Sequence, residues 1–502
     1  MTFTVCGATI LDGSGGEPFV SNVTVAEDRI VSVGSLTSGE VVDGDGLFLT
    51  PGFIDCHCHD DLASLRDPSR PEKVAQGVTT VVVGNCGFSL FPCSPSSREQ
   101  LRQHAGGLLG RLGESEVFSD YASYRQANRS VVRVESLVGH GPLRLQAMGW
   151  ESRPASASEL ALMCDLLATQ LDQGACGLSL GLVYPPSAFA DLDELVALAK
   201  VAKSRGKPVT AHIRSYESKL VEATQEFLSV LRLSGARGVL SHLQAAGRPN
   251  WGLVAQALEA MEAAEVDVVC DMYPYLAGSS YALQLLPPSE LASGVSALQA
   301  RLAEPAYRLL LRNRVMSAEV DENGWQSKVA LIGWESVLIA GVSALSLKSL
   351  EGKTLASAGE DPFDVLIRLV MEDDGASAVI LFQLSEPDLR TVFQNPLSMV
   401  GSDGIPRFEG RPHPRAFGAF PRFWQKVCQQ DRWLAAPEAI AKMTSRSAIA
   451  FGLNDRGVIR PGSLADLVLF DPSFRDQATF EDPRQLASGT KQVWIGGNPV
   501  LA

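Results

Sequence analysis

The chain has 502 residues, of which 43 are Lys or Arg and 57 are Asp or Glu, so its formal net charge is −14 with histidine neutral. Hydrophobic residues make up 45% of the chain, which is typical of a globular protein and excludes disorder as the main state. A chain of this length is expected to form one large domain with an accessory part, or about two to three domains. The acidic excess provides no basic stripe for a phosphate backbone, so we expect no nucleic-acid partner.

Three further features bear on where the protein works. The first basic residue is Arg29, so the start of the chain lacks the charged segment of a secretory signal. No apolar run approaches the roughly 20 residues that span a bilayer, so we expect no membrane partner. The nine cysteines are an odd number without the spacing of a disulfide framework, which favours reduced thiols. We therefore predict a cytoplasmic protein, and the sequence leaves its oligomeric state open.

Both ends of the chain are predicted to form β-strands. Near the N-terminus these strands cover residues 19–25 and 29–33, with Gly-rich breaks around them. Near the C-terminus they cover residues 464–470 and 492–495, separated by Pro and Gly turns. We expect residues 1–50 plus 455–502 to form one small β-sandwich domain built from both termini.

The middle of the chain, residues 51–454, alternates apolar strands with amphipathic helices. Four helices with apolar residues at i, i+3, i+4 and i+7 are predicted over residues 160–173, 192–205, 219–233 and 253–263. Eight short apolar strands are predicted around residues 53–57, 79–84, 132–138, 176–180, 209–213, 239–243, 266–273 and 397–400. A strand and helix series of this kind forms a parallel sheet, and eight strands close a (β/α)8 TIM-like barrel. The predicted fold class is therefore α/β.

A long segment separates the seventh and eighth predicted strands. It covers roughly residues 274–396, which is too long for one connection between strands of a barrel. We expect an inserted subdomain at residues 281–350. Its place after a barrel strand predicts a lid over the barrel mouth, and a surface packing subdomain or an oligomer contact is the alternative.

Five of the seven histidines fall at or just after the end of a predicted barrel strand, namely His57, His59, His140, His212 and His242. A single histidine is most often a packed residue, but active sites of such barrels are built at this end of the strands. His57 and His59 lie two apart in a strand, so both imidazoles point to the same side and can share one cation. His212 and His242 are one strand and helix repeat apart. Together these side chains predict a site for Zn²⁺, which favours nitrogen, sulfur and oxygen donors.

Two further residues end barrel strands at the same edge. Asp403 follows the last strand and is the natural candidate to accept a proton from an activated water; a turn aspartate before Gly404 is the alternative. Cys86 follows the second strand. A lone cysteine is usually a buried, inert thiol, but its position beside the His57 strand indicates a thiolate ligand.

These motifs resemble the N-acyl-D-amino-acid deacylase (D-aminoacylase) family of the amidohydrolase superfamily. The matching segments span the chain, at residues 51–61, 76–89, 138–144, 177–185, 211–214, 241–242, 271–275, 401–404, 413–415 and 460–468. The resemblance implies a metal-dependent barrel with one tight zinc and a second, weaker or empty metal position. It assigns the tight zinc to Cys86, His212 and His242. The second position is lined by His57, His59 and Asp403, with Asp403 as the general acid/base.

One observation separates this chain from other branches of the superfamily. No lysine lies between Gln173 and Tyr184, so the fourth strand cannot supply a carbamylated lysine as a bridging ligand. Cys86 is the substitute that the resemblance implies. This argues against the hydantoinase and dihydroorotase branches, which resemble the chain only at the paired histidines and the final aspartate.

The resemblance also implies residues that handle the substrate. Tyr184 and Tyr275 match tyrosines that hold the carboxylate of the amino acid, and Tyr273 and Arg415 are weaker candidates. A tyrosine before or after proline is otherwise most often a packing residue. His140 is predicted beside the site, either as a donor to the developing oxyanion or as support for the ligands.

A departure from the family pattern leaves the substrate open. Family members carry a second histidine and a lysine where this chain has Leu243 and Gln244, and that lysine pairs with the substrate carboxylate. A neutral amide can bind a carboxylate but lacks the charge-assisted contribution, which is roughly twice as strong. Either a basic residue such as Arg214 or Arg415 compensates, or the substrate lacks that carboxylate.

Three hypotheses follow. The first is zinc-dependent hydrolysis of a linear N-acyl amide, most simply a small N-acyl-D-amino acid that yields a carboxylate and a D-amino acid. The second keeps this chemistry but acts on a larger acylated or peptide-like metabolite without the free α-carboxylate. The third is a catalytically silent scaffold of the same fold, which would be expected to have lost ligands. None of the ligands is missing here.

Overall fold

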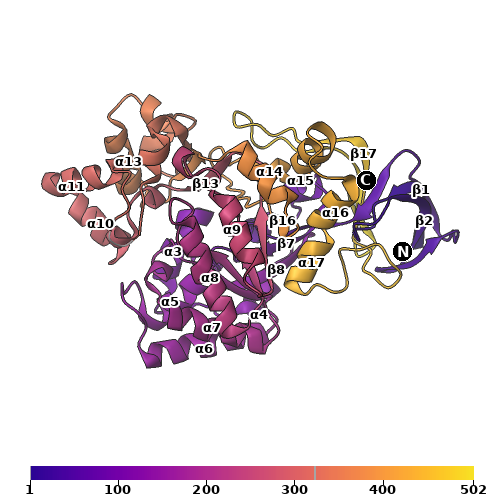
Figure 1. The fold of residues 1–502 in the computed structure, drawn as a ribbon, viewed down its shortest axis with the longest axis horizontal. Coiled ribbons are helices and arrows are strands. Elements are labelled where there is room, and N and C mark those ends of the chain that lie inside the picture. Colours follow the sequence, from indigo (N-terminus) through magenta and orange to yellow (C-terminus); the bar gives the residue numbers. More distant parts are fainter. Residues whose placement is uncertain (1, 322–323, 502) are drawn as a thin grey trace.

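The computed structural model describes residues 2–321 and 324–501. Figure 1 shows three regions: a central barrel with its helices, a β-sheet where both ends of the chain meet, and an inserted region that projects from the barrel on the opposite side from this sheet. The predicted α/β class is confirmed, because eight parallel strands form one sheet with helices between them.

The barrel strands follow one another around the sheet in chain order. They are β6 (Phe53–Asp55), β7 (Val78–Val83), β8 (Arg133–Gly139), β9 (Gly177–Gly181), β10 (Val209–His212), β11 (Gly238–Leu240), β12 (Val268–Met272) and β16 (Ser398–Val400). The first and last strands meet just beyond their ends, where Cys58 pairs with Gly404 and the His59 N–H donates to the Gly404 carbonyl at 2.8 Å. All eight predicted strands are present, and their carboxyl ends face the same side.

Amphipathic helices cover the outside of the barrel. The four predicted helices are α6 (Ala157–Asp172), α7 (Leu192–Ser204), α8 (Leu220–Ser234) and α9 (Leu253–Glu262). The Ser156 and Asp191 side chains cap α6 and α7, and Gly235, at φ 69°, ends α8 in the left-handed conformation that glycine adopts without strain. Within the described part of the chain, no helix is both long enough and apolar enough to span a bilayer.

Shorter helices complete the barrel layer. They are α1 (Ala63–Arg66), α2 (Pro71–Val74), α3 (Arg98–Leu109), α4 (Tyr121–Ala127), α5 (His140–Met148), α14 (Glu386–Gln394), α15 (Arg415–Phe423), α16 (Ala436–Met443) and α17 (Ser445–Phe451). Of these, α15 begins with Arg415 and α5 begins with His140, two residues that the sequence singles out. Both residues thus occupy the first position of a helix.

The strands from the two termini form one mixed sheet. They are β1 (Thr2–Ile10), β2 (Phe19–Ala26), β3 (Arg29–Gly34), β4 (Glu40–Asp43), β5 (Phe48–Pro51), β17 (Leu467–Arg475), β18 (Ser488–Ile495) and β19 (Asn498–Leu501). β17 pairs with β5, which joins the two ends of the chain. The sheet folds over itself, because Phe3 on β1 stacks on Trp494 on β18 with ring centroids 5.0 Å apart although two strands separate them. The expected sandwich is thus one continuous, folded sheet.

The inserted region is longer than the segment 281–350 that the sequence indicates. Its own antiparallel sheet has β15 (Ala378–Phe382) between β13 (Ala277–Tyr281) and β14 (Val337–Gly341). Four helices pack around it, namely α10 (Val295–Leu302), α11 (Pro305–Met316), α12 (Lys328–Ile332) and α13 (Pro362–Glu372). The boundaries shift because the central strand, β15, comes last in the chain and pairs with both others.

Candidate metal centre and substrate cavity

The predicted ligands converge at the carboxyl ends of the barrel strands. His57 and His59 follow β6, Cys86 follows β7, and His212 ends β10. His242 follows β11 and Asp403 follows β16. All of these residues except His212 are buried.

Three of these residues have a backbone conformation that is rare outside glycine. Cys86, His242 and Asp403 have φ values of 55°, 35° and 46°. Such left-handed residues cost energy and persist where the surroundings fix them, often at functional sites. Hydrogen bonds fix two of them, since the His242 N–H donates to Asp271 Oδ1 at 2.9 Å and the Asp403 N–H donates to the His57 carbonyl at 2.7 Å.

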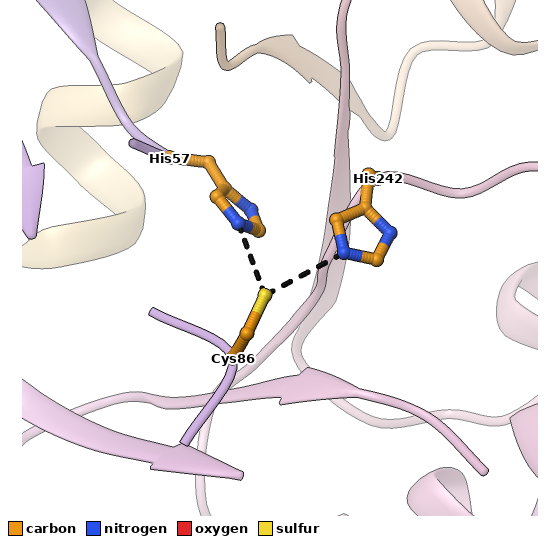
Figure 2. A group of neighbouring side chains, drawn as sticks. All are labelled: His57, Cys86 and His242. Atoms are coloured by element: carbon orange, nitrogen blue, oxygen red, sulfur yellow. Dashed lines mark hydrogen bonds between the residues drawn. The ribbon is translucent and has the colours of Figure 1, made fainter. Parts of the chain in front are cut away.

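One cluster is centred on the thiol of Cys86. Its Sγ lies 3.3 Å from His57 Nε2 and 3.6 Å from His242 Nε2, and Figure 2 shows both rings pointing at the sulfur. Burial by itself raises the pKa of this thiol, but the charge of His57 and hydrogen bonds to the surrounding histidines bring the pKa well below its ordinary value. Cys86 is therefore set up as a thiolate.

A second cluster shares His57. Asp403 Oδ1 lies 3.2 Å from His59 Nε2 and 3.5 Å from His57 Nε2. On its other side, Asp403 Oδ2 forms an ion pair with Arg415 Nη2 at 2.8 Å. Burial raises the pKa of Asp403, but Arg415, His59 and the other cationic neighbours hold the pKa well below its usual range. These neighbours therefore favour the ionised form of the carboxylate, which is the form that a proton acceptor requires.

The ligand grouping differs in one respect from the resemblance. The donor atoms of His57, Cys86 and His242 all lie within 4.8 Å of one another, as do those of His57, His59 and Asp403. His212, the expected third ligand of the tight site, lies beside the first group with its ring centroid 4.5 Å from that of His242. His57 thus belongs to both groups.

The donor set fits zinc. With Zn–N bonds of about 2.0 Å and Zn–S bonds of about 2.3 Å, neighbouring ligands of a tetrahedral ion lie roughly 3.5 Å apart. The separations of 3.3 and 3.6 Å around Cys86 match this value. One thiolate, imidazoles and one carboxylate are also the donor types that zinc prefers.

The end of the fourth barrel strand lies close to the Cys86 loop. β9 ends at Gly181, and a Cβ at this position would collide with the carbonyl oxygen of Cys86. The Cys86 loop therefore packs directly against the end of this strand.

Several residues that the sequence analysis did not assign hold the ligands in place. Asp271, at the end of β12, accepts from His57 Nδ1 at 3.1 Å and also binds the His242 N–H. The Tyr216 ring lies 4.9 Å from the rings of both His212 and His242. The position of Asp271 at the end of a barrel strand was the available signal, whereas nothing in the sequence pointed to Tyr216.

A buried ionic network supports the His57 and Asp403 segments from below. Lys73 Nζ lies 2.6 Å from Asp55 Oδ2 and 3.2 Å from Asp60 Oδ2. Asp55 also accepts from the Ser402 hydroxyl at 2.6 Å. Burial lowers the pKa of Lys73, but the two carboxylates more than offset this effect and raise it above the ordinary value. The network therefore connects β6 and the loop after it to the segment that follows β16.

The metal ligands face a small cavity of about 50 Å³. The barrel contributes polar side chains to its wall, among them Tyr184, Gln244 and Tyr273. The inserted region contributes others, namely Ser279, Ser280, Gln284, Lys328 and Gln383. The insertion is thus part of the wall of the site.

Three of the predicted substrate residues come together here. The Tyr184 hydroxyl lies 3.4 Å from His212 Nδ1. Gln244 Oε1 accepts a hydrogen bond from the Tyr273 hydroxyl at 2.8 Å. Arg415 lies with its guanidinium carbon 4.3 Å from the centroid of the Tyr273 ring, between that ring and Asp403. Tyr273, the weaker candidate, therefore occupies the place expected for Tyr275.

Tyr275 is not among the residues that line this cavity, and its substrate contact stays a prediction. Its hydroxyl donates to Asp476 Oδ2 at 2.7 Å, and its ring packs on Arg422. The reason is a turn after β12, in which the Tyr275 N–H donates to the Tyr273 carbonyl at 3.0 Å. This turn breaks the alternation of side chains and directs Tyr275 toward the C-terminal segment.

His140 also lies away from the cavity wall. It is the first residue of α5, and its Nε2 lies 2.7 Å from Glu194 Oε1 on α7, which also binds Arg144. The structure therefore places His140 against Glu194, and its expected role as an oxyanion donor or as support for the ligands stays a prediction. Arg214, a candidate to compensate for Gln244, binds Glu226 at 2.9 Å and backbone carbonyls instead of facing the metal ligands.

The fold and the site define a metal-dependent amidohydrolase, and residues 356–501 match the model of the Amidohydrolase family. The N-acyl-D-aspartate deacylase of Alcaligenes xylosoxydans xylosoxydans is 35% identical over 517 residues, covering 99% of this chain and 91% of that protein. The chain therefore belongs to the D-aminoacylase family of the amidohydrolases.

Two solved structures support the same conclusion. N-acyl-D-glutamate deacylase from Bordetella bronchiseptica, complexed with zinc and a phosphonate mimic of the tetrahedral intermediate, matches with a TM-score of 0.84 and 31% identity, covering 99% of this chain and 96% of that one. A D-aminoacylase with a binuclear metal centre matches with a TM-score of 0.81 and 31% identity, covering 99% and 95%. Both structural matches are thus metal-dependent deacylases that cover almost the whole of this chain.

Proposed function

We propose that this protein is a zinc-dependent N-acyl-D-amino-acid deacylase, which hydrolyses a linear amide to a carboxylate and a D-amino acid. The observation that carries the proposal is the ionised Asp403, placed 3.2 Å from His59 and 3.5 Å from His57 beside a cysteine-centred donor set. Family membership supports both the reaction and the metal.

Zinc is assigned to the two groups of donors. Cys86, His212 and His242 hold the tight ion, with His57 within reach of the same sulfur. His57, His59 and Asp403 form a second, weaker position. When bound, zinc lowers the pKa of a water ligand to about 7 and polarises the amide carbonyl.

Asp403 performs the proton transfers. Its carboxylate accepts a proton from the attacking water at Oδ1, while Arg415 keeps Oδ2 engaged. The same carboxyl group then returns the proton to the amide nitrogen, because an amine cannot leave as an anion. Asp271 holds His57 in one orientation during these steps through the bond to Nδ1.

The amino-acid end of the substrate is assigned to the side of the cavity that carries Tyr273 and Gln244. The Tyr273 hydroxyl donates to Gln244 Oε1 and so fixes the amide, which leaves the Gln244 Nε2 group as the donor for a carboxylate. Arg415 lies against the same tyrosine ring, outside the cavity wall and paired with Asp403. Tyr184 lies on the opposite side, next to His212.

The setting is assigned as the cytoplasm, with a small N-acylated molecule as the partner and no nucleic acid or membrane. All nine cysteines are free, which supports a reducing compartment.

Hydrolysis of paired N-acetyl-D- and N-acetyl-L-amino acids tests the proposal. The zinc-loaded protein is supplied with the Met, Leu, Phe, Glu and Asn derivatives, and amine release is followed. Turnover of the D series that disappears in Asp403→Asn is the expected result. Equal turnover of both series would contradict the D assignment, and no turnover of either by a zinc-containing protein would contradict a small N-acetyl amino acid as the substrate.

One observation favours a second candidate. Gln244 is neutral, and Lys328, the lone Lys or Arg among the described residues that line the catalytic cavity, is already bound to Glu217 at 2.9 Å. A larger acylated amine without the α-carboxylate would need no cation there. Faster hydrolysis of N-acetyl-D-amino acid amides than of the free acids would support this candidate over the first.

A further inference from the structure

A second, larger cavity adjoins the catalytic one. It has a volume of about 790 Å³, whereas the catalytic cavity has about 50 Å³. A volume of about 10–15 Å³ of this kind holds one water molecule, so the catalytic cavity has room for only a few waters. An N-acylated amino acid must therefore extend beyond it.

The two cavities share part of their walls. Glu217, Gln284 and Lys328 line both of them. Glu217 lies in the loop after β10, Gln284 follows β13, and Lys328 begins α12 of the inserted region. Lys328 Nζ lies 2.9 Å from Glu217 Oε1, with side chains 18% and 6% exposed. This ion pair marks the junction between the cavities.

Apolar side chains from two regions form much of the outer cavity. The barrel loop after β9 contributes Leu182, Val183 and Phe189, and the inserted region contributes Leu286 and Pro288. The outer cavity therefore has an apolar surface on both sides, one from the barrel and one from the insertion. Burying an apolar group between them is favourable in proportion to the area removed from water.

Six of the seven charged side chains among the described residues that line the outer cavity pair with one another, and the seventh, Asp321, pairs with Arg314 at 3.1 Å. Arg214 binds Glu226, and Lys219 binds Glu222, each at 2.9 Å. Together with the Lys328 and Glu217 pair, these contacts leave no excess of charge among these six side chains. A charged ligand would have to break a pair to bind there, whereas an apolar chain would not.

The position of the outer cavity matches one end of the substrate. The amino-acid end is assigned to Tyr273 and Gln244, beside β11 and β12. The outer cavity instead lies over the loops after β9 and β10, on the Tyr184 and His212 side. An amide bound at the metal centre with its amino acid toward Tyr273 therefore directs its acyl group toward the outer cavity.

We propose that the outer cavity is the acyl subsite and that it takes an unbranched apolar acyl chain of medium length, which passes the Glu217 and Lys328 pair. This inference rests on the proposed deacylase function and adds the acyl specificity to it. The methylene stem of Lys328 offers apolar contact to the chain while its ammonium group stays on Glu217. The preferred substrates are then N-octanoyl-type amides rather than N-acetyl amides.

A series of N-acyl-D-leucines with two to ten acyl carbons tests the proposal. Each buried methylene adds to binding, so kcat/KM is expected to be at least about tenfold higher for the octanoyl than for the acetyl substrate. Ala292→Trp fills the outer cavity from the insertion and should remove this advantage, so that the ratio of octanoyl to acetyl kcat/KM falls to about one. Ala300→Trp, at an exposed position of α10 outside the cavity, is the matched control and should keep the wild-type ratio.

The opposite results are equally clear. A kcat/KM that stays constant or falls with chain length in the wild type would overturn the acyl subsite while leaving the deacylase function intact. An equal loss of acetyl and octanoyl turnover in Ala292→Trp would overturn it as well.

A binding measurement separates the inference from the proposed function. Calorimetric titration of the zinc-loaded wild type with octanoate and with acetate should show at least about tenfold tighter binding of octanoate, lost in Ala292→Trp and kept in Ala300→Trp. This pattern without any amide hydrolysis would reject the deacylase function and retain the apolar subsite. Equal binding of the two acids would reject the subsite.

Discussion

The two walls of the catalytic cavity are built differently. The barrel wall carries buried ionisable groups on strained backbone, with Cys86, His242 and Asp403 all at positive φ. The insertion wall carries neutral polar side chains such as Ser279, Ser280 and Gln383 on regular strands or next to them, and one charged side chain, Lys328. The comparison teaches that the reaction belongs to the barrel and that the insertion shapes what the barrel receives.

The largest loss of activity is expected when the proton acceptor on the barrel wall, Asp403, is removed. Asp403→Asn keeps the size of the side chain but cannot accept a proton, so kcat for an N-acyl-D-amino acid should fall by about a factor of 10³. Zinc content, measured by atomic emission, should stay at the wild-type value for the tight site. Retained kcat in Asp403→Asn would remove Asp403 from the mechanism.

The network beneath the barrel wall is expected to dominate stability. Lys73→Met leaves Asp55 buried without its cation and leaves Asp60 with Arg70 alone, which should lower the free energy of unfolding by about 3–5 kcal/mol. Urea unfolding followed by fluorescence measures the change. Lys219→Met, which breaks an exposed pair with Glu222, is the control and should cost less than about 1 kcal/mol.

A lysine in place of Gln244 on the barrel wall tests whether the substrate carboxylate binds there. Gln244→Lys adds a cation next to Tyr273, so KM for N-acyl-D-amino acids should fall by about tenfold. Substrates whose carboxylate is converted to an amide should show no such gain. An equal effect on both substrates would place the carboxylate elsewhere.

A change in the insertion wall should have the smallest effect. Ser279→Ala removes one hydroxyl from a half-buried position on β13, and KM should rise by about two- to fivefold while kcat stays within about twofold. Steady-state kinetics with one D substrate decides the matter. A large loss of kcat in Ser279→Ala would show that the insertion takes part in the reaction itself.

The barrel could be predicted from the sequence because its signals are local and periodic. Each of the eight apolar strands was predicted from a short run of residues, and helix-ending glycines such as Gly235 marked the boundaries. Since parallel strands place their carboxyl ends together, the approach of Cys86, His57 and His242 to one another followed from the topology alone.

Side-chain direction beyond the strand ends could not be predicted in the same way. Tyr273 and Tyr275 are two residues apart, yet a turn between them directs one to the cavity and the other to Asp476. His140 begins a helix and reaches Glu194. The end of the insertion was missed because β15 pairs with strands far away in the chain, and a sequence pattern carries no record of such pairing.

Metal removal and return tests the central claim most directly. The protein is stripped with a chelator and titrated with zinc while the turnover of N-acyl-D-leucine and N-acyl-L-leucine is followed. The account predicts that turnover of the D substrate disappears without zinc and returns with the first equivalent, with the L substrate inert throughout. Turnover that persists in the stripped protein, or that returns equally for both substrates, would contradict it.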